Sequence, residues 1–177
     1  MAEYIAFHPD NEVLGSASIS ALLALDEINV KVLLEKHNLS SSQDDWNPQQ
    51  YELDLMRELA EGDFFNMIKV GMKITEIAKL PPEIQTVHQI LGSMNAAYHM
   101  NVRGPDIGCY GYEKLSDRSA RVICTNPYPS DFDYGLIYNF TRRFAPSDTE
   151  FVRVVRDDSI PNRKNGGSDT CIYTVEW

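Results

Sequence analysis

Apolar residues recur at helical spacing throughout the first hundred positions of the chain. Residues 18–25, with Ser18 as a helix cap, and residues 30–36 show this spacing, which predicts two short helices or one broken helix. A third helix is expected over residues 51–61, with Gly62 as its C-cap and Asp63 as the N-cap of a fourth helix. The first part of the chain should therefore be helical.

The third and fifth helices carry the clearest apolar faces. Tyr51 and Leu55 belong to the apolar face of the third helix. Pro82 fixes the backbone for a new helix start, and Glu83 places a negative charge in its first turn. We therefore expect a fifth helix over residues 83–100.

The apolar positions change to the alternating pattern of half-buried strands after residue 104. Strands are expected over residues 107–114, 120–125, 151–156 and 171–177. Helical spacing returns between the two strand pairs, over residues 130–144. Ser130 and Asp133, three residues apart, form a variant of the capping box at the start of this helix.

This order of elements predicts an α+β fold. N-terminal helices should pack on a C-terminal, mainly antiparallel four-stranded sheet, with one helix inserted between the strand pairs. The helical part covers about residues 16–100 and the strand-containing part about residues 105–177. A chain of 177 residues fits one domain, so residues 1–177 are expected to form a single folded unit.

The composition limits which binding partners and which cellular compartment are expected for the protein. The 26 acidic and 16 basic residues give a formal charge of −10, which repels phosphates and excludes nucleic acid as a direct partner. Neither a signal peptide nor an apolar run long enough to span a membrane is visible. The three cysteines are widely spaced and odd in number, which favours a reducing cytoplasm over a disulfide framework.

Several short segments add to the element order. They are His99 with Arg103-Gly104, residues 126–129 leading into residues 134–137, and Gly166-Gly167 leading to residues 171–173 and Trp177. With the element order, they resemble the 4-vinyl-reductase-like branch of the superfamily that also contains haem-nitric-oxide/oxygen-binding (H-NOX) domains and vesicle-tethering TRAPP subunits. The resemblance implies a domain that holds a small apolar ligand or a lipid between helices and sheet, commonly as a sensory module.

The resemblance also allows a test for haem. Haem-binding members use a histidine shortly before the first strand as the iron ligand, and a Tyr-x-Ser-x-Arg element to hold the propionates. His99 lies near the first position, but residues 122–128 lack the tyrosine, serine and arginine in that order. The sequence thus predicts that His99 stabilises the end of its helix rather than binding iron.

A metal site is a further alternative. A single Cys/His site, with zinc as the metal, could form from His99, Cys109, Cys124 and Cys171, but single ligands far apart are weaker signals than paired C-x-x-C elements. Buried cysteines are also common as small core residues. Neither haem nor zinc is favoured as a cofactor.

Aromatic residues are the remaining candidates for ligand contact. The ligand-binding set consists of His99, Tyr110, Tyr112, Tyr128, Tyr134 and Tyr138. The alternative is that these rings only fill the core. Asp131 and Asp133 are expected to stabilise a helix start, and Arg163 to lie on a solvated face.

These observations favour a non-enzymatic sensory or ligand-binding domain, because no catalytic triad or phosphate loop is visible. The expected partners are a small-molecule ligand, a second copy of the chain bound through the N-terminal helices, and a signalling protein. Three alternatives stay open. They are a haem-binding gas sensor that uses His99, a structural or tethering dimerisation module, and a metal-dependent enzyme centred on His99 and the cysteines.

Overall fold

A computed structural model describes residues 3–15, 19–40, 42, 44–61, 67–161, 163 and 167–177. The N-terminal elements are β1 (Glu12–Leu14), α1 (Ile19–Leu25), α2 (Glu27–Lys36), β2 (Trp46–Pro48) and α3 (Gln49–Glu61). They are followed by α4 (Met67–Ile77), α5 (Val87–Asn101) and β3 (Val102–Arg103). The C-terminal elements are β4 (Cys109–Ser116), β5 (Ser119–Thr125), α6 (Ser130–Phe144), β6 (Arg153–Arg156) and β7 (Thr170–Glu176).

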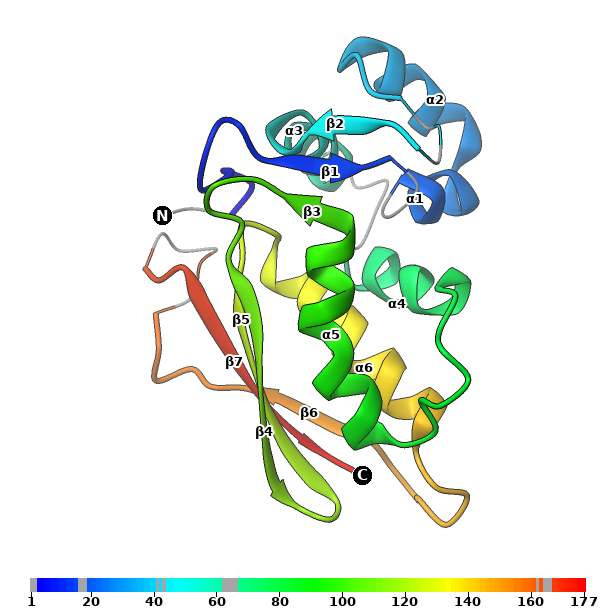
Figure 1. The fold of residues 1–177 in the computed structure, drawn as a ribbon, viewed down its shortest axis with the longest axis vertical. Coiled ribbons are helices and arrows are strands. Elements are labelled where there is room, and N and C mark those ends of the chain that lie inside the picture. Colours follow the sequence, from blue (N-terminus) through cyan, green and yellow to red (C-terminus); the bar gives the residue numbers. More distant parts are fainter. Residues whose placement is uncertain are drawn as a thin grey trace.

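The main sheet confirms the predicted α+β architecture. Its strands lie in the order β4-β5-β7-β6, and all neighbours are antiparallel. Every second residue of β5 and β7 is buried, so one face of the sheet carries the core. Helices α5 and α6 pack against this sheet, and α6 is the predicted helix between the strand pairs (Figure 1).

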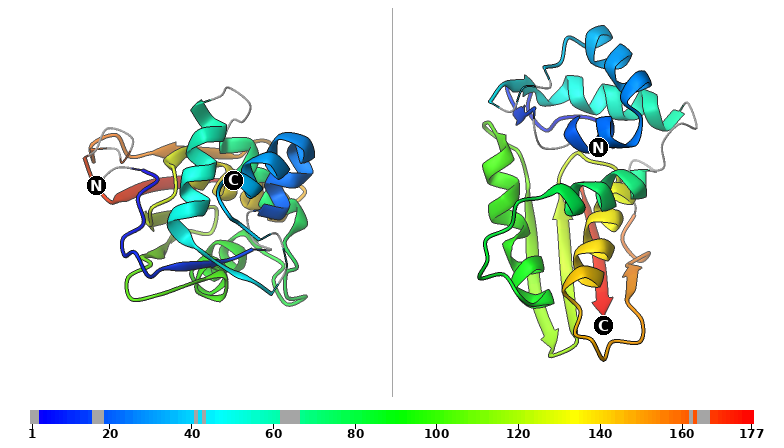
Figure 2. Two further views of the ribbon diagram at one scale, coloured as in Figure 1. Left: turned by 90° about the horizontal axis from the view of Figure 1, so that it is seen from above. Right: turned by 90° about the vertical axis from the view of Figure 1, so that its right-hand side faces the viewer.

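A small second sheet was not predicted from the sequence. Strands β2, β1 and β3 form it, with antiparallel pairing on both sides of β1. Arg103 on β3 binds Glu12 on β1 with Nε at 2.7 Å from Oε2, and its guanidinium lies 4.0 Å from the Trp46 ring. This sheet connects the N-terminal elements to the end of α5, and these elements lie at one end of the molecule (Figures 1 and 2).

One predicted helix start and one predicted helix cap are wrong in detail. Helix α5 begins at Val87 rather than near Glu83, because Thr86 and Gln89 form a capping box three residues later than expected. Helix α6 has Pro129 at its N-cap and no side-chain cap from within its own sequence. The predicted caps at Ser18, Gly62 and Asp63 lie outside the described residues.

Helices α4 and α6 approach each other closely at two glycines. A Cβ atom on Gly71 would overlap the carbonyl oxygen of Phe132, and one on Gly135 would overlap that of Ile68. The two backbones therefore touch, which places α6 firmly between α4 and the sheet. This contact positions the first turn of α6, from which the buried acid Asp133 projects.

The N-terminal leucines mostly enter the shared core. Leu22 and Leu34 are buried, and Leu23 and Leu33 are partly buried against the same cluster. Tyr51, which was assigned to the apolar face of α3, is instead 46% exposed. Among the described residues, no helix combines the length and the hydrophobicity needed to cross a membrane.

Candidate functional site

The first turn of α3 directs two polar side chains into the protein. Gln49 and Glu52 are three residues apart and therefore share a helix face, and both are fully buried. Asn11, just before β1, is buried beside them. The backbone N–H of Gln49 donates to the backbone carbonyl oxygen of Asn11 at 2.8 Å, and Asn11 Nδ2 donates to Gln49 Oε1 at 3.1 Å.

Two tyrosines from the other half of the chain complete this group. Tyr128, in the loop before α6, donates its hydroxyl to Glu52 Oε2 at 3.2 Å. Tyr98, on α5, donates to the carbonyl oxygen of Ile107 at 2.5 Å, and its ring lies edge-on to that of Tyr128 at 6.4 Å. We call Asn11, Gln49, Glu52, Tyr98 and Tyr128 the junction cluster.

The junction cluster contains polar atoms that the protein leaves unsatisfied. Within the described part of the chain, Asn11 Oδ1 and Glu52 Oε1 are buried and accept no hydrogen bond. The Gln49 amide lies beside the hydroxyl groups of Tyr98 and Tyr128, but its Nε2 makes no hydrogen bond of good geometry. Buried polar atoms in proteins are nearly always paired, so these exceptions require an explanation.

Burial also changes the ionisation of the cluster. It raises the pKa of Glu52 from 4.5 to about 8, while the Tyr128 hydrogen bond opposes this shift to a smaller extent. Burial likewise raises the pKa of Tyr128 well above its ordinary value. Near neutral pH, Glu52 is therefore largely uncharged.

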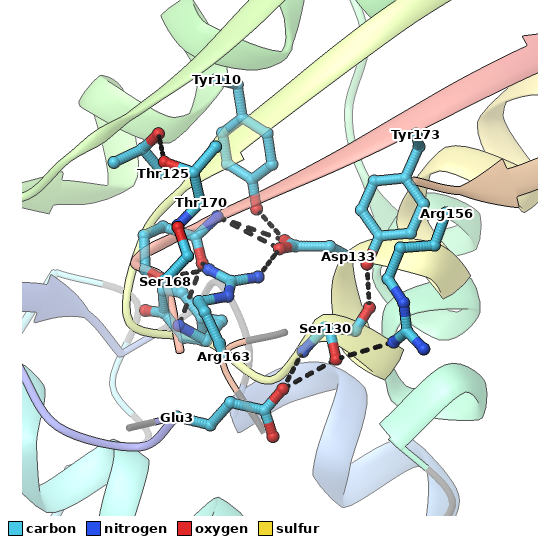
Figure 3. Close-up of polar contacts among 12 residues, drawn as sticks. Glu3, Tyr110, Thr125, Ser130, Asp133, Arg156, Arg163, Ser168, Thr170 and Tyr173 are labelled. Carbon is cyan, nitrogen blue, oxygen red and sulfur yellow. Dashed lines mark hydrogen bonds and ion pairs between the residues drawn. The ribbon is translucent and has the colours of Figure 1, made fainter. Parts of the chain in front are cut away.

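A second buried group surrounds Asp133 on the inner side of α6 (Figure 3). Asp133 and Arg163 form an ion pair in which both side chains are almost completely buried. Tyr110 donates its hydroxyl to Asp133 Oδ1 at 2.6 Å, and Asn126 Nδ2 approaches the same oxygen at 3.3 Å. We call Tyr110, Asn126, Asp133 and Arg163 the Asp133 cluster.

The Asp133 cluster corrects two sequence-based expectations. Asp133 does not cap its helix but binds a guanidinium, and Arg163 is buried rather than solvated. Arg163 also donates to the carbonyl and side-chain oxygens of Asn126. Burial and the neighbouring Asp133 raise the pKa of Tyr110 well above its ordinary value, which keeps its hydroxyl a hydrogen-bond donor.

The two clusters are connected through the loop before α6. The backbone N–H of Tyr128 donates to Asn126 Oδ1 at 3.0 Å, so each cluster fixes one end of this loop. At the start of α6, Glu3 accepts hydrogen bonds from the backbone N–H of Ser130 at 2.8 Å and from its hydroxyl at 2.7 Å (Figure 3). A carboxylate distant in sequence thus replaces the expected local cap.

The predicted aromatic ligand set is divided between several places. Tyr110 and Tyr128 belong to the two buried clusters described above. Tyr134 and Tyr138 stack on each other with ring centres 6.1 Å apart, and Tyr134 lines a hollow of about 240 Å³ with Ser130 and Arg156. Tyr112 lies elsewhere, with its hydroxyl 2.6 Å from Nδ1 of His88 on α5.

The four predicted metal ligands are not brought together. Cys124 and Cys171 face each other across β5 and β7 in the buried face of the sheet, whereas Cys109 and His99 are exposed. Burial raises the pKa of the Cys124 thiol well above its ordinary value, which disfavours the thiolate that a metal requires. No three His, Cys, Asp or Glu side chains in the described ranges are placed to hold a metal ion.

The described residues also do not fit a haem bound through His99. Its side chain is exposed, while its neighbour Tyr98 points into the protein. The Tyr98 ring packs edge-on against Tyr110 at 5.3 Å and against Tyr128 at 6.4 Å, so side chains occupy the space beside this helix end. The loop before α6 offers the buried Asn126 in place of a propionate-binding arginine.

Sequence reasoning missed most of the buried polar residues. Glu52 carries a readable signal, because it lies three and four residues before Leu55 and Met56, both fully buried. A charged residue on this apolar stripe could have been recognised as buried. Asn11 and Arg163 stand in loop-like sequence and carry no comparable local signal.

Comparisons with known proteins identify the fold. No protein-family model and no curated protein matches the chain. A crystal structure of an oxygen-binding H-NOX domain related to soluble guanylate cyclases matches with a TM-score of 0.64 and 12% identity over 91% of both chains. An H-NOX protein from S. oneidensis in the Fe(II)NO state gives a TM-score of 0.64 at 12% identity, over 91% of this chain and 97% of that one. An unliganded Fe(II) H-NOX variant from K. algicida gives a TM-score of 0.62 at 13% identity, over 92% of this chain and 95% of that one. The chain therefore has the fold of H-NOX domains.

Proposed function

We propose that this protein is a haem-independent sensory domain that binds a small ligand at the junction cluster. The observation that carries the proposal is a pair of buried oxygens, Asn11 Oδ1 and Glu52 Oε1, that find no hydrogen-bond partner among the described residues. Leaving such an atom unpaired costs about 1–3 kcal/mol, which a ligand with a cationic hydrogen-bond donor would recover, because the positive charge also favours the ionised form of Glu52. The solved structures of similar fold include a domain described as oxygen-binding, which supports a ligand-binding role.

The position of the cluster supports signalling. Asn11, Gln49 and Glu52 come from β1, α3 and their surroundings, whereas Tyr98 and Tyr128 belong to α5 and the loop before α6. A ligand that bonds to both groups changes the free energy of contact between the two parts of the fold. Ligand binding can then shift their relative position, as a sensory domain requires.

The alternative explanation is an ordered water molecule. A buried water typically makes two to four hydrogen bonds and would satisfy the same atoms. The two explanations differ in whether the purified protein retains a ligand and in whether added compounds raise the stability of the protein. A water-filled site gains nothing from an added donor ligand, whereas a ligand site does.

Native mass spectrometry and thermal unfolding of the full chain test the proposal. We expect retained mass in the freshly purified protein, or a cationic, donor-rich compound in a small-molecule screen that raises its melting temperature. Glu52→Gln should abolish either effect, because the amide keeps the shape of the side chain but removes the acid. Glu58→Gln, on the same helix but exposed, is the matched control and should behave as the wild type. The proposal would be contradicted if the purified protein retained no ligand mass and no compound distinguished Glu52→Gln from Glu58→Gln.

The haem-binding alternative is tested by absorbance. Mixing the protein with haem should leave the broad Soret band of free haem unshifted, because His99 and the loop before α6 do not form a haem site. A shifted and sharpened Soret band that His99→Ala abolishes would restore the gas-sensor interpretation.

We further propose a cytoplasmic homodimer through the N-terminal helices, acting on a signalling partner. Val32 on α2 is 61% exposed and Leu25 on α1 is 37% exposed, which leaves apolar surface for a second copy. Light scattering should give a dimer mass, and Val32→Glu should return a monomer. A monomer mass for the unmodified protein would contradict this part of the proposal.

A further inference from the structure

A larger hollow lies at the end of the molecule opposite the N-terminal elements. The start of α5, the turn between β4 and β5, the end of α6 and the C-terminal end of β7 meet there (Figure 1). Its volume is about 640 Å³, within the range of about 300–1,000 Å³ typical of small-molecule sites. We call it the Trp177 hollow, and its main lining residues are Val87, His88, Arg118, Arg143, Phe144 and Trp177.

One wall of the hollow is aromatic and held in place. The His88 and Trp177 rings meet at 70° with their centres 4.8 Å apart. His88 Nε2 lies 3.1 Å from the carbonyl oxygen of Asp117, and Nδ1 lies 2.6 Å from the Tyr112 hydroxyl. Because a carbonyl only accepts, Nε2 donates and Nδ1 accepts, so both ring nitrogens are satisfied. The Trp177 backbone N–H donates to the Arg118 carbonyl oxygen at 3.1 Å, which fixes the other side of the wall.

Among the described residues, the charges around the hollow leave one cation, Arg143, without a counter-charge. Arg118 is neutralised by Asp148, with Nη2 at 2.9 Å and 2.8 Å from the two carboxylate oxygens. Asp117 is neutralised by Lys114 at 2.7 Å. Arg143 forms no ion pair with any residue that the structure describes, and its guanidinium lies 5.9 Å from the Phe144 ring centre. The first turn of α5 also contains no acidic residue, so the positive N-terminal end of the helix dipole adds to the positive charge of Arg143.

We infer that the Trp177 hollow binds a planar organic monoanion, whose ring packs on the aromatic wall and whose carboxylate meets Arg143. Arginine binds carboxylates through two parallel hydrogen bonds, and amphipathic rings hold flat ligands. The net charge of −10 disfavours anions elsewhere on the protein, so a bound anion here requires a local site. This site is separate from the junction cluster and does not depend on the proposed function.

Arg143 also has a simpler role that the test must separate. It belongs to the last turn of α6 with Arg142, and both arginines interact favourably with the carbonyl groups at that helix end. Arg142 is equally exposed but does not line the hollow. Replacing Arg142 therefore reproduces the loss of charge at the helix end without changing the hollow.

Fluorescence titration with 2-naphthoate, and with its neutral analogue 2-naphthamide, tests the inference. Of the two tryptophans, Trp46→Phe leaves Trp177 as the only reporter. We expect 2-naphthoate to quench the Trp177 fluorescence in a saturable way. The affinity of the parent for 2-naphthamide, and that of Arg143→Gln for 2-naphthoate, should each be about tenfold weaker, a difference of about 1.4 kcal/mol. Arg142→Gln should bind the acid as the parent does. Absence of saturation, equal binding of acid and amide, or equal losses in the two arginine variants would each overturn the inference.

Discussion

Replacing Glu52 by glutamine should remove a pH dependence that burial introduces into the stability of the fold. Burial raises the pKa of the Glu52 carboxyl from 4.5 to about 8 in the folded protein, and the Tyr128 hydrogen bond opposes this only in part. In the unfolded chain the same group ionises near 4.5. Between these two values, the folded protein holds a proton that the unfolded chain has released.

The sign and size of the effect follow from this difference. The stability associated with protonated Glu52 is fully present below pH 4.5 and is lost as the pH rises through about 8. The interval is about 3.5 pH units, and at about 1.4 kcal/mol per unit the full loss is on the order of 5 kcal/mol. A typical domain has a total stability of only about 5–15 kcal/mol, so the change should be easy to measure.

Urea denaturation over a range of pH values measures the effect. The free energy of unfolding of Glu52→Gln, relative to the wild type, should rise by about 3–5 kcal/mol between about pH 5 and pH 8. Other titrating groups contribute equally to both proteins and cancel in the difference. Hydrogen bonds from Lys36 and His37 lower the pKa of Glu58, so the stability difference between Glu58→Gln and the wild type should stay constant between about pH 5 and pH 8 and shrink only at more acid pH. Parallel curves for the wild type and Glu52→Gln over this range would refute the reasoning.

The buried ion pair and the contact between α4 and α6 make two further predictions, both measurable by urea denaturation. Asp133→Asn leaves the Arg163 guanidinium buried without its counter-charge and should lower the free energy of unfolding by about 3–5 kcal/mol. A loss below about 1 kcal/mol would show that Arg163 reaches solvent. Gly71→Ala should cost more than about 2 kcal/mol, because its Cβ would overlap the Phe132 carbonyl oxygen. In Gly92→Ala, the added Cβ meets only an aromatic ring at 3.6 Å, so higher helix propensity should give a gain of up to about 1 kcal/mol. Equal effects of the two alanines would contradict the close approach of α4 and α6.

The local pattern of the sequence was enough to predict the main sheet and the helix inserted in it. It could not reveal β1, β2 and β3, because strands of two or three residues are too short to show an alternating pattern. The start of α5 was misplaced for a different reason. Pro82-Glu83 and Thr86 both resemble helix starts, and only the reciprocal bonds between Thr86 and Gln89 decide between them.

The candidate site was harder to predict than the fold because its contacts join distant parts of the chain. Asp133 looks like a helix-capping residue, and its actual partner Arg163 is 30 residues away in a turn-rich segment. Glu3 fills the expected role of a cap from 127 residues away. Local sequence shows which side chains are charged, but the choice of partner depends on tertiary packing.

The two buried acids differ in a way that favours the junction cluster as the place for a ligand. The oxygens of Asp133 already accept from Tyr110, Asn126 and Arg163, so a ligand there would have to displace existing partners. Glu52 has one partner, and its second oxygen has none among the described residues. A cationic donor placed on that oxygen displaces no existing partner and gains about 1–3 kcal/mol. Its charge favours the ionised carboxylate, so binding should move the pH dependence of stability to lower pH.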